Sequence, residues 1–195
     1  MTDELKVEVP FEEKEDSVCC VGTLSEDRGI KALVHACYKA GVKLILGGNF
    51  SPASFGEELK NEESFSIVDY RGYCTREEVN RIYQCLIGSD TILPVGQYPL
   101  INNLSTKTYE YMAMKMPYIT SNFNYNKKII DEYHTGIYVD PTNEDEIAEA
   151  ILYLIKNKNE AKQMGENGRK LIEEKLSWTN DEKRLNELYM KLYNS

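Results

Sequence analysis

Short apolar segments alternate with amphipathic segments along most of this chain, and this alternation limits the folds open to it. Six short segments are expected to be buried strands: 17–22, 42–46, 65–70, 91–94, 117–120 and 137–139. Amphipathic helical segments separate them and fill the chain beyond Pro141. Strands that alternate with helices pair in parallel, with helices on both faces of one sheet. We therefore expect an α/β fold: a doubly wound, Rossmann-like, mostly parallel sheet of about six strands, with extra helices at the C-terminus.

Two of the expected helices have recognisable starts. Thr75 and Glu78 have the spacing of a capping box, in which each side chain bonds the backbone N–H of the other residue. The helix that follows is expected to run as far as Leu86, since apolar residues recur at helical spacing up to that point. A second helix is expected from about Ser105 to Met114.

The charge balance and the rarity of metal-binding residues exclude several classes of function. Asp and Glu number 32 against 23 Lys and Arg, which gives a net charge of −9, so a nucleic acid is not an expected partner. The sequence has five cysteines without a C-x-x-C pair and two histidines, which predicts neither a zinc site nor a disulfide framework. We expect a cytoplasmic protein with no metal, because its cysteines suit a reducing compartment and no secretion signal is recognisable.

The loop after the first expected strand lies where parallel sheets bind ligands, at the carboxyl ends of the strands. This loop, Gly22 to Gly29, has neither the G-x-G-x-x-G fingerprint nor the G-K-[ST] end of a P-loop. These absences argue against a nicotinamide enzyme and a P-loop NTPase. Arg28 could hold an anionic ligand through its bidentate fork. It could equally pair with Glu26 or Asp27, and the residues alone leave both interpretations open.

The segment 102–110 has the features of an anion site. Ser105, Thr106 and Lys107 fall in the first turn of an expected helix, where free backbone N–H groups and the helix dipole attract anions. Glu110 follows in the same helix and could accept two hydrogen bonds from a vicinal diol. Together these groups suit a nucleoside diphosphate. The alternative is that a hydroxyl residue only caps the helix and Glu110 only complements its dipole.

Several segments of the chain resemble one known family. The sequence E-Y-M-A-M-K-M-P-Y-I-T-S from Glu110 to Ser121 resembles the E-Y-M-A-x-G-K-P-V-I-x-S signature of retaining glycosyltransferases with the GT-B fold, in the family 4-like group. Five further elements of that family are matched in order: 22–29, 71–73, 105–109, 134–141 and Ser177-Trp178.

The resemblance covers residues 17–195 and implies the C-terminal, nucleotide-sugar-binding domain of such an enzyme. Residues 1–16 would be an acidic N-terminal segment, and the N-terminal, acceptor-binding domain is expected to be absent. The longer enzyme is then expected to be a hexosyltransferase of surface polysaccharide synthesis. This enzyme would use a nucleoside-diphosphate sugar as substrate and would need no cofactor. Any peripheral association with a membrane is expected only for the full-length enzyme and not for this domain. The fragment alone is expected to be inactive.

The resemblance also implies roles for individual residues. Glu110 stands where the family binds the ribose, and Arg28 stands where it grips the diphosphate. The remaining expected ligand-binding residues serve the phosphates, the base and the sugar: Gly22, Thr23, Gly48, Tyr73, Cys74, Asn102, Ser105, Thr106 and Lys107.

The chain also departs from the family pattern at three positions. Asn102 replaces a glutamate, Thr23 replaces an arginine, and Lys115 stands near a usual glycine. No residue is assigned as catalytic. Two alternatives therefore stay open: a non-catalytic nucleotide-binding module of the same fold, and a fragment of a GT-B-like sugar-nucleotide epimerase.

Overall fold

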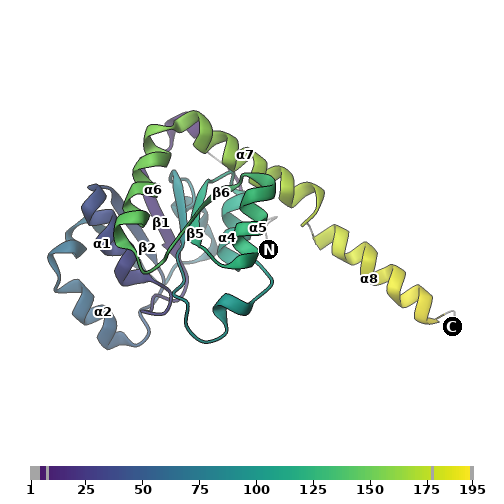
Figure 1. Cartoon of the computed structure of the whole chain (residues 1–195), viewed down its shortest axis with the longest axis horizontal. Coiled ribbons are helices and arrows are strands. Elements are labelled where there is room, and N and C mark those ends of the chain that lie inside the picture. Colours follow the sequence, from purple (N-terminus) through teal and green to yellow (C-terminus); the bar gives the residue numbers. More distant parts are fainter. Residues whose placement is uncertain (1–4, 8, 177, 194–195) are drawn as a thin grey trace.

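A computed structural model describes residues 5–7, 9–176 and 178–193 of the protein, and a single parallel sheet forms its centre (Figure 1). The strands are β1 Ser17–Val21, β2 Lys43–Gly47, β3 Val68–Gly72, β4 Ile87–Asp90, β5 Tyr118–Ser121 and β6 Gly136–Val139. They lie in the order β3-β2-β1-β4-β5-β6, and every neighbouring pair is parallel. The expected doubly wound α/β fold is confirmed.

Helices connect the strands and extend beyond the last one. They are α1 Ile30–Ala40, α2 Ala53–Lys60, α3 Arg76–Ile82, α4 Thr106–Ala113, α5 Asn124–Tyr133, α6 Glu144–Lys156, α7 Lys158–Glu174 and α8 Trp178–Tyr193. Short 3-10 helices occupy Phe11–Glu13, Glu63–Ile67 and Tyr98–Leu100. Figure 1 shows α8 extending away from the sheet and its covering helices. Ser177, part of one family motif, lies outside the described residues. No helix in the described ranges is long and apolar enough to cross a membrane.

Two apolar layers hold the helices against the sheet. Side chains alternate between the faces of a strand, so Val18 and Cys20 of β1 pack with α1, α2 and α6, while Cys19 packs on the opposite face. That opposite face is covered by α3, α4, α5 and α7. Burial of both faces explains why these strands read as continuous apolar runs.

Three expected element bounds are wrong. The fourth strand is Ile87–Asp90 and not 91–94, because pairing with β1 and β5 buries this glycine-, serine- and aspartate-containing segment in spite of its low strand propensity. The third strand begins at Val68, after a 3-10 helix that includes Phe65. The capping box at Thr75 is present, but α3 ends at Ile82 and not near Leu86, because the chain turns there to enter β4.

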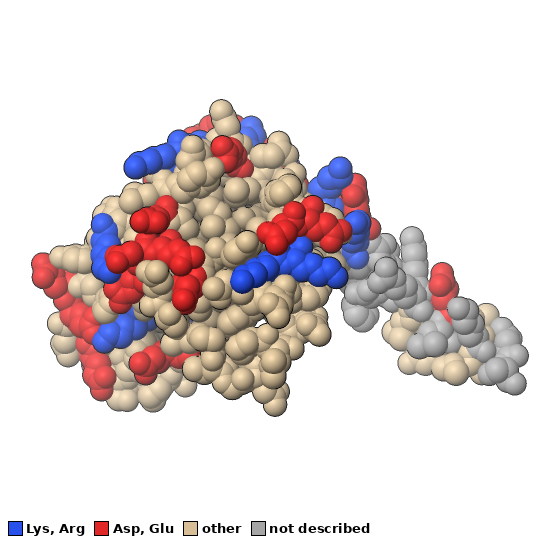
Figure 2. All heavy atoms as spheres, in the orientation of Figure 1, with Lys and Arg blue, Asp and Glu red and all other residues tan. Residues whose placement is uncertain are grey.

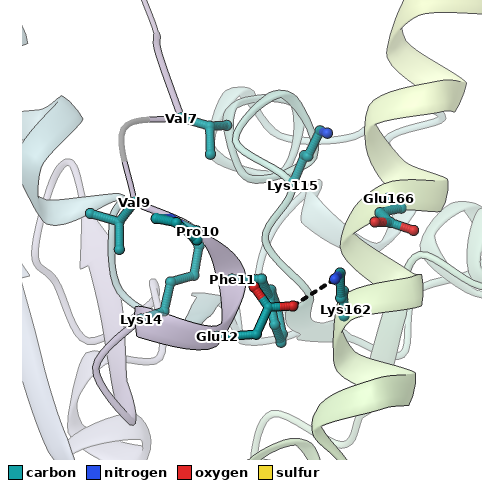
Figure 3. A pocket seen from close by; sticks show the side chains of 9 residues that line it. All are labelled: Val7, Val9, Pro10, Phe11, Glu12, Lys14, Lys115, Lys162 and Glu166. Carbon is teal, nitrogen blue, oxygen red and sulfur yellow. Dashed lines mark hydrogen bonds and ion pairs between the residues drawn. The ribbon is translucent and has the colours of Figure 1, made fainter.

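The segment before β1 packs against the amino end of the sheet. The backbone N–H groups of Lys6 and Val9 donate to the side chains of Asn80 (2.9 Å) and Gln84 (3.2 Å) at α3 and the turn that follows it. A hollow of about 180 Å³ lies between this segment, the turn after α4 and α7 (Figure 3). Its wall includes Lys14, which lies just before β1.

Two of the charged side chains at this amino end, Glu12 and Lys14, are held by other groups of the protein. Figure 3 shows Glu12 reaching across the hollow to Lys162, 2.6 Å away. The Lys14 ammonium donates to the carbonyl groups of Tyr83 (3.4 Å) and Cys85 (3.2 Å), just beyond the end of α3. Burial lowers the pKa of Lys14. These contacts give the amino end a structural role.

The face of the molecule drawn in Figure 2 is more acidic than basic. Acidic side chains gather over the α1, α2 and α6 side, and basic side chains stand in separate small groups. On the part of this face that the structure describes, there is no continuous basic surface of the kind that binds a nucleic acid backbone.

Candidate functional site

The strand order reverses between β1 and β4, and a crevice opens at the carboxyl ends of these two strands. The connections that follow β1 and β4 leave the sheet in opposite directions, so the two loops diverge and leave a crevice between them. Doubly wound sheets bind ligands at such a point. The loop from β1 to α1, residues 22–29, forms one side, and the loop from β4 to α4, residues 91–105, forms the other. Five of the eleven expected site residues come from these two loops, and three more follow in α4.

A hollow of about 170 Å³ lies between the two loops. Six of the eleven expected site residues line it together with Val21: Gly22, Thr23, Arg28, Ser105, Thr106 and Lys107. The structure therefore brings together the residues that we assigned to the phosphates, although the two groups are separated by more than seventy positions in the sequence.

The first turn of α4 presents free donors to this hollow. Ser105 is the N-cap, and its hydroxyl accepts a hydrogen bond from the Thr108 N–H (3.3 Å). The backbone N–H groups of Thr106 and Lys107 have no acceptor among the described residues. Unpaired N–H groups at a helix start, together with the helix dipole, form an anion site.

Lys107 is held from below by Asp90, at the end of β4. Its ammonium lies 3.0 Å from Asp90 Oδ1, which accepts no hydrogen bond of good geometry from the residues described, so this pairing is ionic. The other oxygen, Oδ2, accepts from the hydroxyls of Ser105 and Thr108 (3.1 Å to the latter). Only 3% of Asp90 is exposed, so the carboxylate is a buried anchor for the first turn of α4.

Burial and pairing act on this ion pair in opposite directions. Burial alone raises the pKa of Asp90, but the Lys107 charge and the hydroxyl hydrogen bonds outweigh it, so the pKa lies below its usual value. Burial alone lowers the pKa of Lys107, and the Asp90 charge reverses that effect and raises the pKa. Both groups are therefore charged at neutral pH.

Arg28 differs from Lys107 because its charge is not neutralised by the protein. No carboxylate among the described residues lies within ion-pair distance of its guanidinium. Its guanidinium carbon instead lies 4.8 Å from the centre of the Tyr98 ring. The neighbouring acids, Glu26 and Asp27, were the alternative partners, and neither takes that role.

A second hollow adjoins the first one. Its volume is about 300 Å³, and it shares Arg28, Ser105 and Thr106 with the first hollow. Its remaining lining consists of Asp90, which is paired with Lys107, and of apolar and amide side chains around Tyr98, Phe123 and Asn126. A ligand with an anionic centre at Arg28 could extend from the first hollow into the second.

Glycines let the backbone segments around the crevice come close together. Gly48 has φ of 130°, and a Cβ atom there would overlap the carbonyl group of Gly22. Gly29 has φ of 69°, and a Cβ atom there would overlap the carbonyl oxygen of Thr91. Gly48 therefore supports the first hollow from the β2 side, although it does not line it.

Glu110 lies beneath the crevice and is bound to protein groups. Its Oε1 accepts from the Arg76 guanidinium and its Oε2 from the Tyr83 hydroxyl, each at 2.7 Å. Only 7% of Glu110 is exposed, and it lines neither hollow. A carboxylate has about four acceptor positions, so these two hydrogen bonds leave about two of them unused. Burial, followed by the charge of Glu110, raises the pKa of Tyr83 far above its ordinary value, which keeps this hydroxyl a donor.

Three other expected residues, Tyr73, Cys74 and Asn102, line neither crevice hollow. Tyr73 is 78% exposed, in the loop between β3 and α3. Cys74, beside it, lines a separate hollow and contacts the Gly72 carbonyl group at 3.3 Å. Asn102 is exposed and lines neither crevice hollow. Within the residues that the structure describes, no cluster of three or more His, Cys, Asp or Glu side chains could hold a metal ion.

Sequence reasoning missed four residues of the crevice. Asp90 was missed because the fourth strand was placed too far along the chain; a correct strand end would have marked this aspartate. Tyr98 lies in an irregular loop without a motif. Arg76 begins α3 and Tyr83 directly follows it, and the contacts of both with Glu110 depend on the packing of α3 against α4.

Similar solved structures share this fold at low sequence identity. The C-terminal domain of a glycosyl transferase group 1 family protein, LpcC from Francisella tularensis, has a TM-score of 0.70 at 17% identity, over 86% of this chain and 89% of that one. HepE from Anabaena in complex with UDP has a TM-score of 0.78 at 14% identity, over 91% of this chain and 49% of that one. Sucrose-phosphate synthase from Thermosynechococcus elongatus has a TM-score of 0.75 at 22% identity, over 95% of this chain and 47% of that one.

This chain therefore spans about half the length of HepE and of the synthase, and it superposes on a C-terminal domain of the GT-B type. No curated protein sequence matches the chain significantly. The family model named "Glycosyl transferases group 1" matches residues 1–171, which include the whole sheet and both crevice loops. This match shows that the chain belongs to the glycosyl transferases group 1 family.

Proposed function

We propose that this domain binds a nucleoside-diphosphate sugar, with the diphosphate in the crevice between β1 and β4. One observation carries the proposal: the first hollow combines an arginine without an acidic partner with the free N–H groups of α4. Such groups bind phosphate oxygens through charge-assisted hydrogen bonds. Three structures of HepE, in complex with UDP, with UDP-glucose, and with UDP and glucose, support this choice of ligand.

The rest of the donor can be arranged from the diphosphate outward. In the proposed arrangement, the ribose approaches Glu110, whose two remaining acceptor positions suit a vicinal diol. The base lies toward Gly48, Tyr73 and Cys74, and the sugar lies toward the second hollow and Asn102. Arg28 and the helix start would then stabilise the negative charge that develops on the departing diphosphate.

Transfer of the sugar needs a second wall for the cleft. We propose that this domain, residues 17–195, is the donor-binding half of a longer cytoplasmic hexosyltransferase that builds surface polysaccharides, with residues 1–16 leading from an acceptor-binding domain. Reactants must be held in line for transfer, so this half alone should show no turnover with a nucleotide sugar and an acceptor. Turnover by the purified 195-residue chain would contradict the proposal that transfer needs a second domain.

A non-catalytic nucleotide-binding module is the second candidate. Asn102 and Thr23, which replace charged residues of the family pattern, favour it. Both candidates bind the nucleotide at the same site, but only the glycosyltransferase transfers a sugar. A longer natural protein that contains this domain, binds the nucleotide and transfers no sugar would favour the module.

Calorimetric titration of the domain with UDP, GDP, ADP and their glucose conjugates tests the proposal. We expect one base series to bind and the matching nucleoside to bind more weakly, because the diphosphate supplies the charge-assisted contacts. Replacing magnesium with EDTA should change the affinity little, because cationic side chains and helix N–H groups are proposed to bind the phosphates. Failure of all six compounds to bind would overturn the proposed function, and a tenfold loss in EDTA would reveal a metal site.

A further inference from the structure

We propose that Tyr98 is a positioning residue that holds the Arg28 guanidinium ready for the diphosphate. This inference rests on the proposed function. It adds a residue from the opposite side of the crevice to those that are proposed to bind the diphosphate. The Arg28 guanidinium carbon lies 4.8 Å from the Tyr98 ring centre, a distance typical of a cation–π contact. Stacking on a ring face restricts the guanidinium, and it leaves the N–H groups at its edge free for an anion.

The Tyr98 hydroxyl also contributes to keeping Arg28 available. Asp27 is the acid next to Arg28 in the sequence, and its Oδ2 accepts a hydrogen bond from the Tyr98 hydroxyl at 3.4 Å. Its Oδ1 accepts from the Ser25 hydroxyl. Asp27 is thus engaged by two hydroxyls and does not neutralise Arg28.

The backbone around Tyr98 fixes the ring in place. Tyr98 begins a 3-10 turn that includes Pro99, whose ring fixes its own φ angle. The Tyr98 N–H donates to the Val95 carbonyl group at 3.3 Å. The two crevice loops are joined where the Leu93 N–H donates to the Asp27 carbonyl group at 2.9 Å. The ring therefore has a fixed position relative to the loop that carries Arg28.

The contact leaves Arg28 at the boundary of the two hollows, because it lines both. An anion bound by the free N–H groups of Thr106 and Lys107 lies in the first hollow, so a guanidinium held at this boundary faces it across the crevice. Without the ring, Arg28 would be free to move into solvent, and ordering it would reduce the binding free energy.

A double-mutant cycle in which UDP and inorganic pyrophosphate are titrated tests the inference. We expect Tyr98→Leu to weaken binding of both anions about 2- to 5-fold, which is the size of an exposed cation–π contact. Tyr98→Phe keeps the ring and removes only the hydroxyl that contacts Asp27, which Ser25 still engages, so it should bind both anions more tightly than Tyr98→Leu does. In the Arg28→Ala background, Tyr98→Leu should have no further effect, whereas a general loss of structure would weaken binding in both backgrounds.

The outcomes separate this inference from the proposed function. If Arg28→Ala weakens binding and Tyr98→Leu does not, the proposed function stands and the positioning role is overturned. The role is also overturned if Tyr98→Phe is as damaging as Tyr98→Leu. If the wild type binds neither pyrophosphate nor any of UDP, GDP and ADP, both proposals fail.

A second measurement covers the case in which Tyr98→Leu does not fold. The side-chain proton signals of Arg28 in NMR spectra of the wild type should be shifted upfield by the ring current of Tyr98, and the shift should persist in Tyr98→Phe. Signals at the ordinary arginine positions would overturn the inference without any variant.

Discussion

The charged groups at the two ends of the central sheet differ in how they are paired. At the amino end, Lys14 is satisfied by two carbonyl groups, and Glu12 is paired with Lys162. At the carboxyl end, Lys107 is paired with Asp90, but Arg28 and two backbone N–H groups have no acidic or carbonyl partner among the described residues. Paired charges stabilise a fold, whereas unpaired donors beside a hollow indicate a ligand.

Asp90→Ala should give the largest effect on stability. It would leave the Lys107 ammonium buried without a counter-charge, and breaking a buried pair in this way costs about 3 to 5 kcal/mol of unfolding free energy. Denaturant unfolding measures the loss. The matched variant at the amino end is Asp16→Ala, which breaks an exposed pair with Lys158 and should have little effect.

A double variant distinguishes loss of the pair from loss of packing. Asp90→Leu combined with Lys107→Met removes both charges, so it should be more stable than Asp90→Ala alone. If the double variant is no more stable than the single one, the buried ion pair does not explain the cost.

Glu110→Ala should have the next largest effect and acts on two properties. Arg76 and Tyr83 each lose a hydrogen bond to this buried carboxylate, which should cost about 1 to 3 kcal/mol of stability. If Glu110 also accepts from the ribose, UDP binding should weaken by about 1.5 to 3 kcal/mol, roughly 10- to 150-fold. Calorimetry with UDP and its 2′,3′-dideoxy analogue separates the two, because the analogue has already lost the ribose contacts.

Glu12→Ala is the matched control at the amino end, where the carboxylate pairs with Lys162 and lies before β1, whereas the crevice loops follow β1 and β4. It should leave UDP affinity unchanged. Unchanged UDP affinity in a folded Glu110→Ala variant would remove Glu110 from the proposed site and leave it a purely structural link between α3 and α4.

His35 should give the smallest effect, seen in the pH dependence of stability. Its Nδ1 and Nε2 contact Glu144 (2.7 Å) and Glu62 (2.5 Å), with Lys31 and Lys39 paired to the same acids. Burial lowers the pKa of His35, and the two carboxylate hydrogen bonds more than reverse this, so the pKa is raised. The stabilisation is therefore complete below the unfolded value near 6.5 and is lost as the pH rises through the folded pKa.

The two carboxylates show the opposite linkage. The hydrogen bonds from Lys31 and His35 lower the pKa of Glu62. Burial raises the pKa of Glu144, but the hydrogen bonds from Lys39 and His35 outweigh burial, so this pKa is lowered too. Their contribution is lost at acidic pH. His35→Gln should remove at most about 1 kcal/mol of stability at pH 6 and flatten the fall in melting temperature above pH 6.5. An unchanged pH profile in His35→Gln would contradict this account.

The sequence predicted the fold better than the details of the site. Apolar runs bounded by glycine marked β1 and β2 closely, because burial on both faces leaves a plain pattern. β4 was misplaced because Gly88, Ser89 and Asp90 are poor strand formers that tertiary pairing forces into the sheet.

Site residues could be predicted where the local sequence determines their position, and could not be predicted where tertiary packing determines it. Ser105, Thr106 and Lys107 follow from a helix start, and that group lies where it was expected. Lys107 pairs with Asp90 across the connection from β4 to α4, and Arg28 stacks on Tyr98 from a loop seventy positions away in the sequence. No local pattern specifies such contacts.

Calorimetric binding of UDP and uridine to the wild type, Arg28→Ala and Lys162→Ala tests the central claim most directly, namely that the carboxyl end of the sheet binds the diphosphate and the amino end does not. The account predicts that Arg28→Ala weakens UDP binding about tenfold or more, less so at high salt, and leaves uridine binding unchanged. Lys162→Ala, at the amino-end hollow, should bind both compounds as the wild type does. Equal UDP affinity in the wild type and a folded Arg28→Ala variant would contradict the claim, as would an equal loss in Lys162→Ala.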